Sequence, residues 1–244
     1  MVAMVKTKTR TKKIRKIKNL FFDIDDVLFP STEFSKLARK NSLNAMIELG
    51  LNKNFKTLER MLERVIKEKG SNYPDHFGIV LERLGVKKPQ QAKFVAAAVG
   101  AYHDTKASIR PYSDVPLALI NLKKKYILYS ASEGIAIKQW DKLIRMKLAL
   151  FFEDVFVSDD LHVQKNSKFY LKIAKKINAK PYQCAMIGDR EDKDIAPAKQ
   201  AGWYTIRIRR EGAKHSKGKT KANEEICSLN ELLTCKSNCK NKSS

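Results

Sequence analysis

An acidic pair closes the stretch Leu20-Phe21-Phe22-Asp23-Ile24-Asp25, and the apolar run before it predicts a β-strand over residues 17–22. A second acidic block, Gly188-Asp189-Arg190-Glu191-Asp192-Lys193-Asp194, follows a similar apolar run at residues 184–187. Carboxylates at the carboxyl ends of parallel strands meet at one edge of the sheet, where open α/β sheets bind their ligands. The two blocks therefore predict one acidic site made from distant parts of the chain.

The chemistry of this acidic site indicates a metal ion. Successive side chains of a strand alternate between its two faces, so we expect Asp23 and Asp25 to point together and Asp26 to point away. Several crowded carboxylates cannot all remain ionised without a cation. Ligand sets made of oxygen alone suit Mg²⁺. The sequence thus predicts a carboxylate–Mg²⁺ site.

A helical region separates the two acidic blocks. Apolar residues recur at helical spacing in four stretches between residues 31 and 109, and Gly50, Gly70 and Gly85 mark the ends of the first three. Pro89 opens the fourth stretch, and no convincing strand pattern interrupts the series. This pattern predicts an all-helical domain over residues 31–109, inserted into the surrounding fold.

From Arg110-Pro111 onward, strand and helix patterns alternate. Strands are predicted at residues 126–130, 155–158, 184–187 and 203–208, with helices at 136–146, 168–177 and 195–201. Such alternation is typical of an α/β fold with a doubly wound parallel sheet. We therefore expect this core to comprise residues 16–30 and 110–235. A basic tail precedes it at residues 1–15, a short amphipathic piece lies at 226–233, and a disordered tail follows at 236–244.

The net charge of +23 over 244 residues is concentrated in the tail before residue 16 and in a second basic stretch at residues 207–221. Such charge can attract nucleic acid or other polyanions. Solvated basic tails are the more ordinary interpretation, because no aromatic residues are interleaved with the first basic stretch to stack on bases. Nucleic-acid binding therefore stays a secondary hypothesis, and the oligomeric state cannot be read from the sequence.

The rest of the composition favours a cytoplasmic protein without membrane contact. No apolar run reaches the about 18 residues that a membrane span needs. The basic amino terminus has no apolar segment of the secretory type. Four cysteines in a chain of this length do not make a disulfide framework, and Cys184 lies in a predicted buried strand.

The order of these motifs resembles the haloacid dehalogenase-like (HAD) hydrolases. The resemblance rests on an apolar strand ending in Asp-x-Asp, a helical insert, and a parallel core with Gly-Asp-x-x-x-x-Asp. The position of the insert resembles the helical cap of subfamily I, which implies a Rossmann-like core. Three segments look most like an archaeal branch in which some members are described as glyceraldehyde 3-phosphate phosphatases: Ala38-Arg39-Lys40-Asn41, Gly70-Ser71-Asn72-Tyr73-Pro74 and Ala101-Tyr102-His103.

The resemblance implies roles for the acidic residues. Asp23 would be the nucleophile that takes the phosphoryl group as an aspartyl-phosphate. Asp25 would act as general acid and base, and its backbone carbonyl would also bind Mg²⁺. Asp189 would be a further metal ligand beside Asp23. Asp194 would bind the metal or one of its water molecules.

The resemblance also implies groups that hold phosphate. Ser132 matches the hydroxyl of the second motif, with Ser130 as the alternative if the register is displaced by two residues. Lys165 matches the lysine that stabilises the phosphorylated intermediate. The segment after it, Asn166-Ser167, lacks the usual proline-containing turn and looks one residue short, which leaves Lys168 as the alternative.

Together these features predict an Mg²⁺-dependent phosphatase that hydrolyses a small phosphorylated metabolite, a sugar or triose phosphate, through an aspartyl-phosphate. One alternative is a nucleoside monophosphate phosphatase. Another is a HAD-like scaffold that binds RNA or another polyanion through its basic tails. His76 and His103 in the insert are interpreted as packing or surface residues, and Glu133, Glu191 and Asp192 as solvated or supporting charges.

Overall fold

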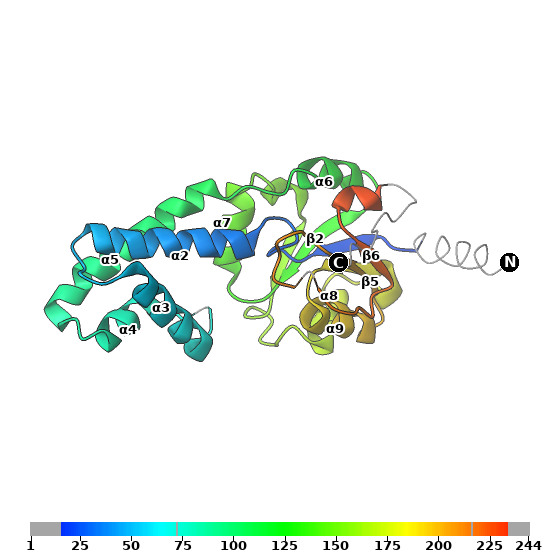
Figure 1. Ribbon diagram of the computed structural model, residues 1–244. Coiled ribbons are helices and arrows are strands. Elements are labelled where there is room, and N and C mark those ends of the chain that lie inside the picture. Colours follow the sequence, from blue (N-terminus) through cyan, green and yellow to red (C-terminus); the bar gives the residue numbers. More distant parts are fainter. Residues whose placement is uncertain (1–15, 72, 216, 234–244) are drawn as a thin grey trace. The chain divides into compact units, whose positions relative to one another are not determined.

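The computed structural model describes residues 16–71, 73–215 and 217–233. The predicted tails at 1–15 and 236–244 lie outside the described residues. The described chain divides into two compact units, one made of residues 16–32 with 110–233 and one of residues 33–109 (Figure 1).

The first unit contains a six-stranded parallel sheet with the strand order β3-β2-β1-β4-β5-β6. The chain starts in the middle of the sheet and extends outward on both sides, so the strand order reverses beside β1. Ligands of doubly wound sheets bind at such a reversal. The doubly wound parallel sheet predicted from the sequence is therefore confirmed. Its strands are β1 (Asn19–Phe22), β2 (Ile127–Ser132), β3 (Asp154–Val157), β4 (Cys184–Gly188), β5 (Tyr204–Ile208) and β6 (Glu224–Ile226).

Helices cover both faces of this sheet. Helix α6 (Val115–Lys123) lies on one face, and α8 (Ser167–Lys176) and α9 (Ala196–Gln200) lie on the other (Figure 1). Helix α7 (Ala136–Arg145) follows β2 and packs beside β3. The unit also contains the short helical segments η2 (Ala149–Phe151), η3 (Pro181–Gln183), η4 (Glu191–Ile195) and η5 (Leu229–Leu232).

An aromatic cluster holds α8 and α9 against the sheet. The ring of Phe21 lies 4.9 Å from that of Tyr129 and 4.5 Å from that of Trp203, between ring centroids. The ring of Tyr170 on α8 lies 5.0 Å from that of Trp203. Fully burying one such side chain contributes about 1.5–3 kcal/mol to stability, so this cluster fixes the central strand on which the site depends.

The regular elements in the described part of the second unit are helices: α2 (Ser31–Glu48), which begins in the sheet unit, is followed by α3 (Phe55–Lys69), α4 (His76–Arg83) and α5 (Lys88–Thr105). A 3₁₀ turn, η1 (Lys106–Ser108), follows α5. The predicted glycine stops follow the first three helices. Gly50, Gly70 and Gly85 have φ values of 95°, 83° and 72°, which are backbone conformations that favour glycine. The shared core is formed by Leu43, Met46, Leu51, Leu58, Leu62, Val65, Val80, Leu81, Phe94 and Ala98.

Two elements of the sheet unit were missed by the sequence patterns. Helix α6 lies in a stretch for which no element was predicted. Strand β6 contains Glu224 and Glu225, and its three residues show no strand pattern. It exists because it pairs with β5 in the register Ile206↔Glu224 to Ile208↔Ile226. The amphipathic piece expected at residues 226–233 becomes the end of β6 followed by η5.

Cys184 is buried and is a free cysteine, as its position in a strand predicted. None of the described helices is both long and apolar enough to cross a membrane.

Candidate active site

Three buried carboxylates converge at the carboxyl end of the sheet. One oxygen atom each of Asp23, Asp189 and Asp194 lies within 4.8 Å of the other two. Asp23 directly follows β1, and its backbone N–H donates to Ile187 of β4 at 3.0 Å, so the two strand ends are level. The acidic blocks that are far apart in the sequence are therefore adjacent in space.

Asp194 reaches the cluster through the short segment η4, which is a single π-helical turn. The backbone N–H of Arg190 donates to Asp194 Oδ2 at 3.0 Å, and Asp194 N–H donates to the Arg190 carbonyl at 2.9 Å. A Cβ atom at Gly188 would collide with the Asp194 side chain. Only glycine at this position allows the close approach, which explains the residue type that begins the second acidic block.

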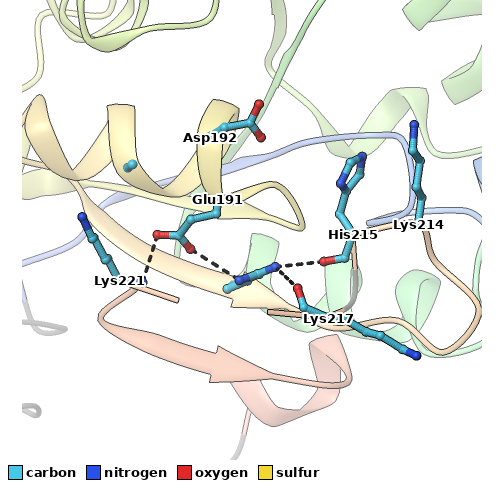
Figure 2. A pocket seen from close by; sticks show the side chains of 8 residues that line it. Glu191, Asp192, Lys214, His215, Lys217 and Lys221 are labelled. Carbon is cyan, nitrogen blue, oxygen red and sulfur yellow. Dashed lines mark hydrogen bonds and ion pairs between the residues drawn. The ribbon is translucent and has the colours of Figure 1, made fainter. Parts of the chain in front are cut away.

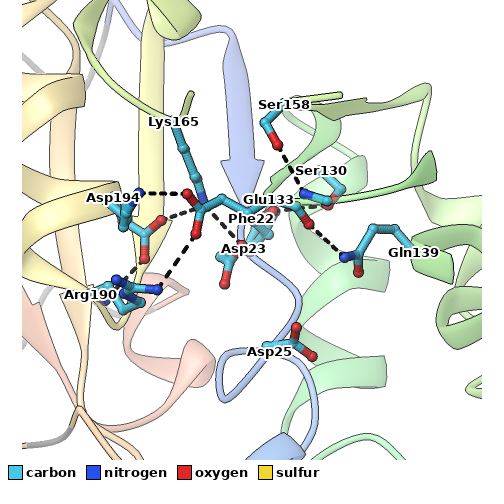
Figure 3. A network of polar contacts seen from close by, with 12 residues as sticks. Phe22, Asp23, Asp25, Ser130, Glu133, Gln139, Ser158, Lys165, Arg190 and Asp194 are labelled. Carbon is cyan, nitrogen blue, oxygen red and sulfur yellow. Dashed lines mark hydrogen bonds and ion pairs between the residues drawn. The ribbon is translucent and has the colours of Figure 1, made fainter. Parts of the chain in front are cut away.

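Lys165 binds two of the three carboxylates. Its Nζ lies 2.9 Å from Asp23 Oδ1 and 2.5 Å from Asp194 Oδ1, and the lysine side chain is 2% exposed (Figure 3). Lys168, the alternative, is exposed at the start of α8, where its backbone N–H donates to Asn166 Oδ1. The structure brings Lys165 to the cluster and leaves Lys168 at the surface.

The cluster has an excess of negative charge. Burial, followed by repulsion from Asp194 and Asp23, raises the pKa of Asp189 to about 8. Burial likewise raises the pKa of Asp194 to about 6, although Lys165 opposes the shift. Burial alone would lower the pKa of Lys165, but the charges of Asp194 and Asp23 hold it well above its usual range. A small divalent cation fits this oxygen-only set, because it would supply the positive charge that one ammonium does not.

Asp25 lies outside this cluster of side chains. Strand β1 ends at Phe22, and the chain turns at Asp26, which adopts a left-handed backbone with φ 55°. The carboxylate of Asp25 instead receives Lys142 Nζ at 2.8 Å on both oxygens. Asp25 therefore does not join the three-carboxylate cluster, and the expectation that Asp23 and Asp25 point together stays a prediction.

The backbone turn is held by Asp26, the residue expected to point away. Its carboxylate accepts the backbone N–H of Thr32 at 2.9 Å and the Thr32 hydroxyl at 2.5 Å. The side chain of Asp26 is buried by this arrangement. Asp26 thus fixes the loop that carries Asp25 rather than contributing to the cluster.

The two candidate serines of β2 differ in their surroundings. Ser130 is paired in register with Phe22, and its hydroxyl donates to the Phe22 carbonyl at 3.1 Å. Ser132 is the last residue of β2 and is buried two residues closer to the carboxyl edge. Ser130 is therefore engaged inside the sheet, whereas Ser132 lies at the edge where the carboxylates gather.

Sequence reasoning missed an ion-pair network that connects the loop after β2 to η4. Glu133 pairs with Lys193 at 2.6 Å and with Arg190 at 3.6 Å (Figure 3). Its backbone carbonyl accepts Gln139 Nε2 at 2.8 Å. Glu133 is therefore a supporting charge between two site loops, a role that no sequence spacing indicates because the partners are about sixty positions apart.

A hollow of about 320 Å³ adjoins η4 on the side of the basic stretch (Figure 2). Arg207 is buried beneath it and donates to the backbone carbonyls of His215, Lys217 and Lys219, each at 2.9 Å. Glu191 accepts the Thr220 hydroxyl at 2.7 Å. These contacts attach the basic stretch to the segment that carries Asp194. The hollow is lined by Glu191, Asp192, Ala196, Arg207, Lys214, His215, Lys217 and Lys221.

The histidines of the insert have ordinary surroundings. A ring nitrogen of His76 lies 2.8 Å from the Gly70 carbonyl, and its ring lies 5.8 Å from that of Tyr73. His103 is exposed on α5. Both positions agree with packing and surface roles.

The structure thus combines a doubly wound parallel sheet with a carboxylate cluster and a buried lysine at the switch point, where such sheets bind their ligands. The family model described as haloacid dehalogenase-like hydrolase matches residues 17–202. The chain therefore belongs to the haloacid dehalogenase-like hydrolase family, and the resemblance stated from the motifs is confirmed.

Relatives and solved structures agree with this assignment. The chain is 44% identical over 199 residues to a glyceraldehyde 3-phosphate phosphatase of Methanopyrus kandleri, covering 80% of this chain and 84% of the relative. It is 37% identical to a glyceraldehyde 3-phosphate phosphatase of Methanocaldococcus jannaschii, covering 92% of this chain and 99% of the relative. The crystal structure of a 2-haloacid dehalogenase from Pseudomonas syringae superimposes with a TM-score of 0.67 at 20% identity, covering 90% and 97% of the two chains. That last likeness concerns the fold.

Proposed function

We propose that the protein is an Mg²⁺-dependent phosphatase that hydrolyses a triose phosphate, with glyceraldehyde 3-phosphate as the first substrate to test. The observation that carries the proposal is the buried contact of Lys165 with both Asp23 and Asp194, next to Asp189. A nucleophilic carboxylate, an adjacent fixed cation and an oxygen-rich metal position are what phosphoryl transfer requires. The names of the archaeal relatives support the substrate.

In the first step, an Asp23 carboxylate oxygen attacks phosphorus, and the bond from phosphorus to the leaving oxygen breaks. Asp25 gives a proton to that leaving oxygen, and an alcohol departs. In the second step, water attacks the aspartyl-phosphate and loses its proton to Asp25, which frees Asp23 and inorganic phosphate. Asp25 returns to its initial protonation state only if both steps occur, so one residue balances the protons of the cycle.

Other residues of the chain hold charge during these steps. Lys165 neutralises negative charge on Asp23 and on the transferring phosphoryl group, because its ammonium is fixed 2.9 Å from the nucleophile. Ser132 donates a hydrogen bond to a phosphoryl oxygen from the end of β2. Asp23, Asp189 and Asp194 would hold Mg²⁺, with the backbone carbonyl of Asp25. The ion would lower the repulsion between the anionic substrate and these carboxylates.

Phosphate release from a matched panel tests this function. The panel contains glyceraldehyde 3-phosphate, a hexose phosphate and a pyrimidine nucleoside monophosphate, each with Mg²⁺ and with a chelator. We expect turnover that requires Mg²⁺ and that is fastest with the triose phosphate. Fastest turnover of the nucleotide would instead support the nucleoside monophosphate alternative.

Two variants make the assay specific for the site. Asp23→Asn removes the nucleophile while keeping the side-chain volume, and a loss of about 10⁴-fold or more in kcat is expected. Asp160→Asn is the control, because Asp160 is exposed on the loop after β3. Retention of full turnover by Asp23→Asn would contradict the mechanism.

Polyanion binding is a second candidate function, supported by the basic lining of the hollow beside η4. Simultaneous substitution of Lys214, Lys217 and Lys221 by Gln tests it with a labelled single-stranded RNA at several salt concentrations. Salt-dependent binding that weakens in the triple variant would support it. No binding by the unmodified protein at physiological salt would dismiss it.

A further inference from the structure

The contact of Lys142 with Asp25 orients the Asp25 carboxylate. Its Nζ lies 2.8 Å from both carboxylate oxygens of Asp25, 117 positions away in the sequence. The lysine side chain is 21% exposed and that of Asp25 is 41% exposed. Two equal contacts fix the carboxylate plane about the ammonium, which a single contact would not do.

A third hydrogen bond fixes the ammonium of Lys142 itself. Its Nζ also donates to Gln139 Oε1 at 3.1 Å, and the amide nitrogen of Gln139 donates to the Glu133 carbonyl at 2.8 Å. Gln139 is buried, and one turn of α7 separates it from Lys142. The ammonium lies 5.8 Å from the ring centre of Phe29, within range of a cation–π attraction.

These contacts form a continuous path between two parts of the proposed site. It runs from the backbone next to Ser132, through Gln139 and Lys142, to the carboxylate of Asp25. All of these residues belong to the sheet unit. The loop that would bind the phosphoryl oxygens and the residue that would protonate the leaving oxygen are thus held by one helix.

We propose that Lys142 is a positioning residue for the reaction: it acts through Asp25 and fixes the carboxyl group that, when it carries a proton, gives that proton to the leaving oxygen. The proposal rests on the proposed phosphatase function. Lys142 itself exchanges no proton with the substrate. Its effect is geometric, since general acid catalysis requires the acid within hydrogen-bond reach of the leaving oxygen.

The leaving group provides a test that a structural role would not affect. The alkoxide of a triose is a poor leaving group and needs a proton as the phosphorus–oxygen bond breaks. A p-nitrophenolate departs without one. We therefore take the ratio of kcat/KM for glyceraldehyde 3-phosphate to kcat/KM for p-nitrophenyl phosphate. This ratio measures proton donation in the phosphoryl-transfer step, because kcat/KM includes no later step.

The decisive variant is Lys142→Met, which keeps the length of the side chain and removes the ammonium. We expect kcat/KM for glyceraldehyde 3-phosphate to fall by about 10–100-fold, a part of what general acid catalysis contributes. For p-nitrophenyl phosphate we expect kcat/KM to change by no more than about threefold, because p-nitrophenolate departs without a proton. Lys142→Arg should recover most of the loss, because a guanidinium also pairs with both carboxylate oxygens.

A double-mutant cycle shows whether Lys142 acts through Asp25. Asp25→Asn alone should reduce the ratio for the two substrates, and Lys142→Met should reduce it no further in that background. Additive losses would overturn the proposal. Equal losses on both substrates in the single variant, or no loss on either, would also overturn it.

Controls separate this proposal from folding and from the proposed function. Lys138→Met changes an exposed lysine one turn earlier on α7 and should leave both substrates unaffected. If Lys142→Met does not fold, Lys142→Gln serves in its place, with the same expected change of the ratio. If the unmodified protein hydrolyses neither substrate, the phosphatase function fails. If it hydrolyses both and the ratio is unchanged in the variants, only the role of Lys142 fails.

Discussion

Two enclosed carboxylate sites in the sheet unit have opposite electrostatics. At Asp114, just before α6, the carboxylate receives Arg210 Nη1 at 2.9 Å on both oxygens, the Ser228 hydroxyl at 2.7 Å and the Leu229 N–H at 2.6 Å. At the strand ends, Asp23, Asp189 and Asp194 lie together, and Lys165 forms ion pairs with Asp23 and Asp194. The charge of Asp114 is balanced by Arg210, whereas the charges of the three clustered carboxylates exceed that of Lys165.

The pKa values of Asp114 and Asp189, one from each site, are shifted in opposite directions. Burial would raise the pKa of Asp114, but the hydrogen bonds from Arg210 and Ser228 hold it below its usual range. Burial and repulsion raise the pKa of Asp189 to about 8. A balanced site stabilises the fold, whereas a site with excess charge costs stability and is retained where chemistry needs it.

Removing the ammonium from the unbalanced site should have the largest effect. We expect Lys165→Met to lower kcat by about 10²–10³-fold, because a fixed charge beside the reacting phosphoryl group is lost. Lys168→Met, at an exposed position three residues away, should retain nearly full activity. Phosphate release under saturating Mg²⁺ measures both variants. The opposite order of losses would assign the phosphate contact to Lys168.

Breaking the balanced site should affect stability and leave chemistry alone. Asp114→Ala leaves the buried Arg210 guanidinium without its carboxylate, so we expect a loss of about 3 kcal/mol in the free energy of unfolding. Urea denaturation followed by circular dichroism measures the loss. At temperatures where the variant is folded, its kcat should match that of the unmodified protein. A tenfold fall in kcat would show that the two sites are coupled.

Binding of Mg²⁺ should reduce the repulsion between the clustered carboxylates and so stabilise the folded protein. With Mg²⁺ at about 100 times its dissociation constant, we expect a gain of about 2.7 kcal/mol in the free energy of unfolding. Asp189→Asn should reduce that gain while raising the stability of the metal-free protein. Thermal unfolding with a chelator and with Mg²⁺ measures both effects. No shift on adding Mg²⁺ would contradict the assignment of a metal site to this cluster.

The pH dependence of the metal-free protein should have a defined sign. The pKa of Asp189 is about 8 in the folded chain, against about 3.9 in an unfolded chain, so the folded state binds the proton more tightly. Its contribution to stability is complete below pH of about 4 and is lost as pH rises toward 8. Urea denaturation between pH 5 and 8 in a chelator should therefore show falling stability. Asp189→Asn should flatten that slope.

Substitution of either serine of β2 by alanine should have the smallest effect on activity or stability. Ser132→Ala should lower kcat/KM by about tenfold, the value of one hydrogen bond to a charged group. Ser130→Ala removes a hydrogen bond to the Phe22 carbonyl inside the sheet. It should cost about 1 kcal/mol of stability and little activity. A larger activity loss for Ser130→Ala than for Ser132→Ala would show that Ser130, and not Ser132, makes the phosphate contact.

Much of this architecture was readable from local patterns. The apolar runs before Asp23 and Asp189 predicted strands, and the glycines at 50, 70 and 85 predicted helix ends. Strand β6 was not readable, because its three residues form a strand only by pairing with β5. The contact between Lys142 and Asp25 was equally hidden, since lysine is abundant and the two residues are 117 positions apart.

The sequence by itself determined the order of the elements, the family and the residue types of the acidic site, because apolar periodicity and short motifs are local properties of a chain. Only the tertiary structure decided which residues share charge. It separated Asp25 from the three clustered carboxylates, selected Lys165 over Lys168 and gave Asp114 a full set of donors. Burial and proximity set these differences, and both depend on how distant segments fold together.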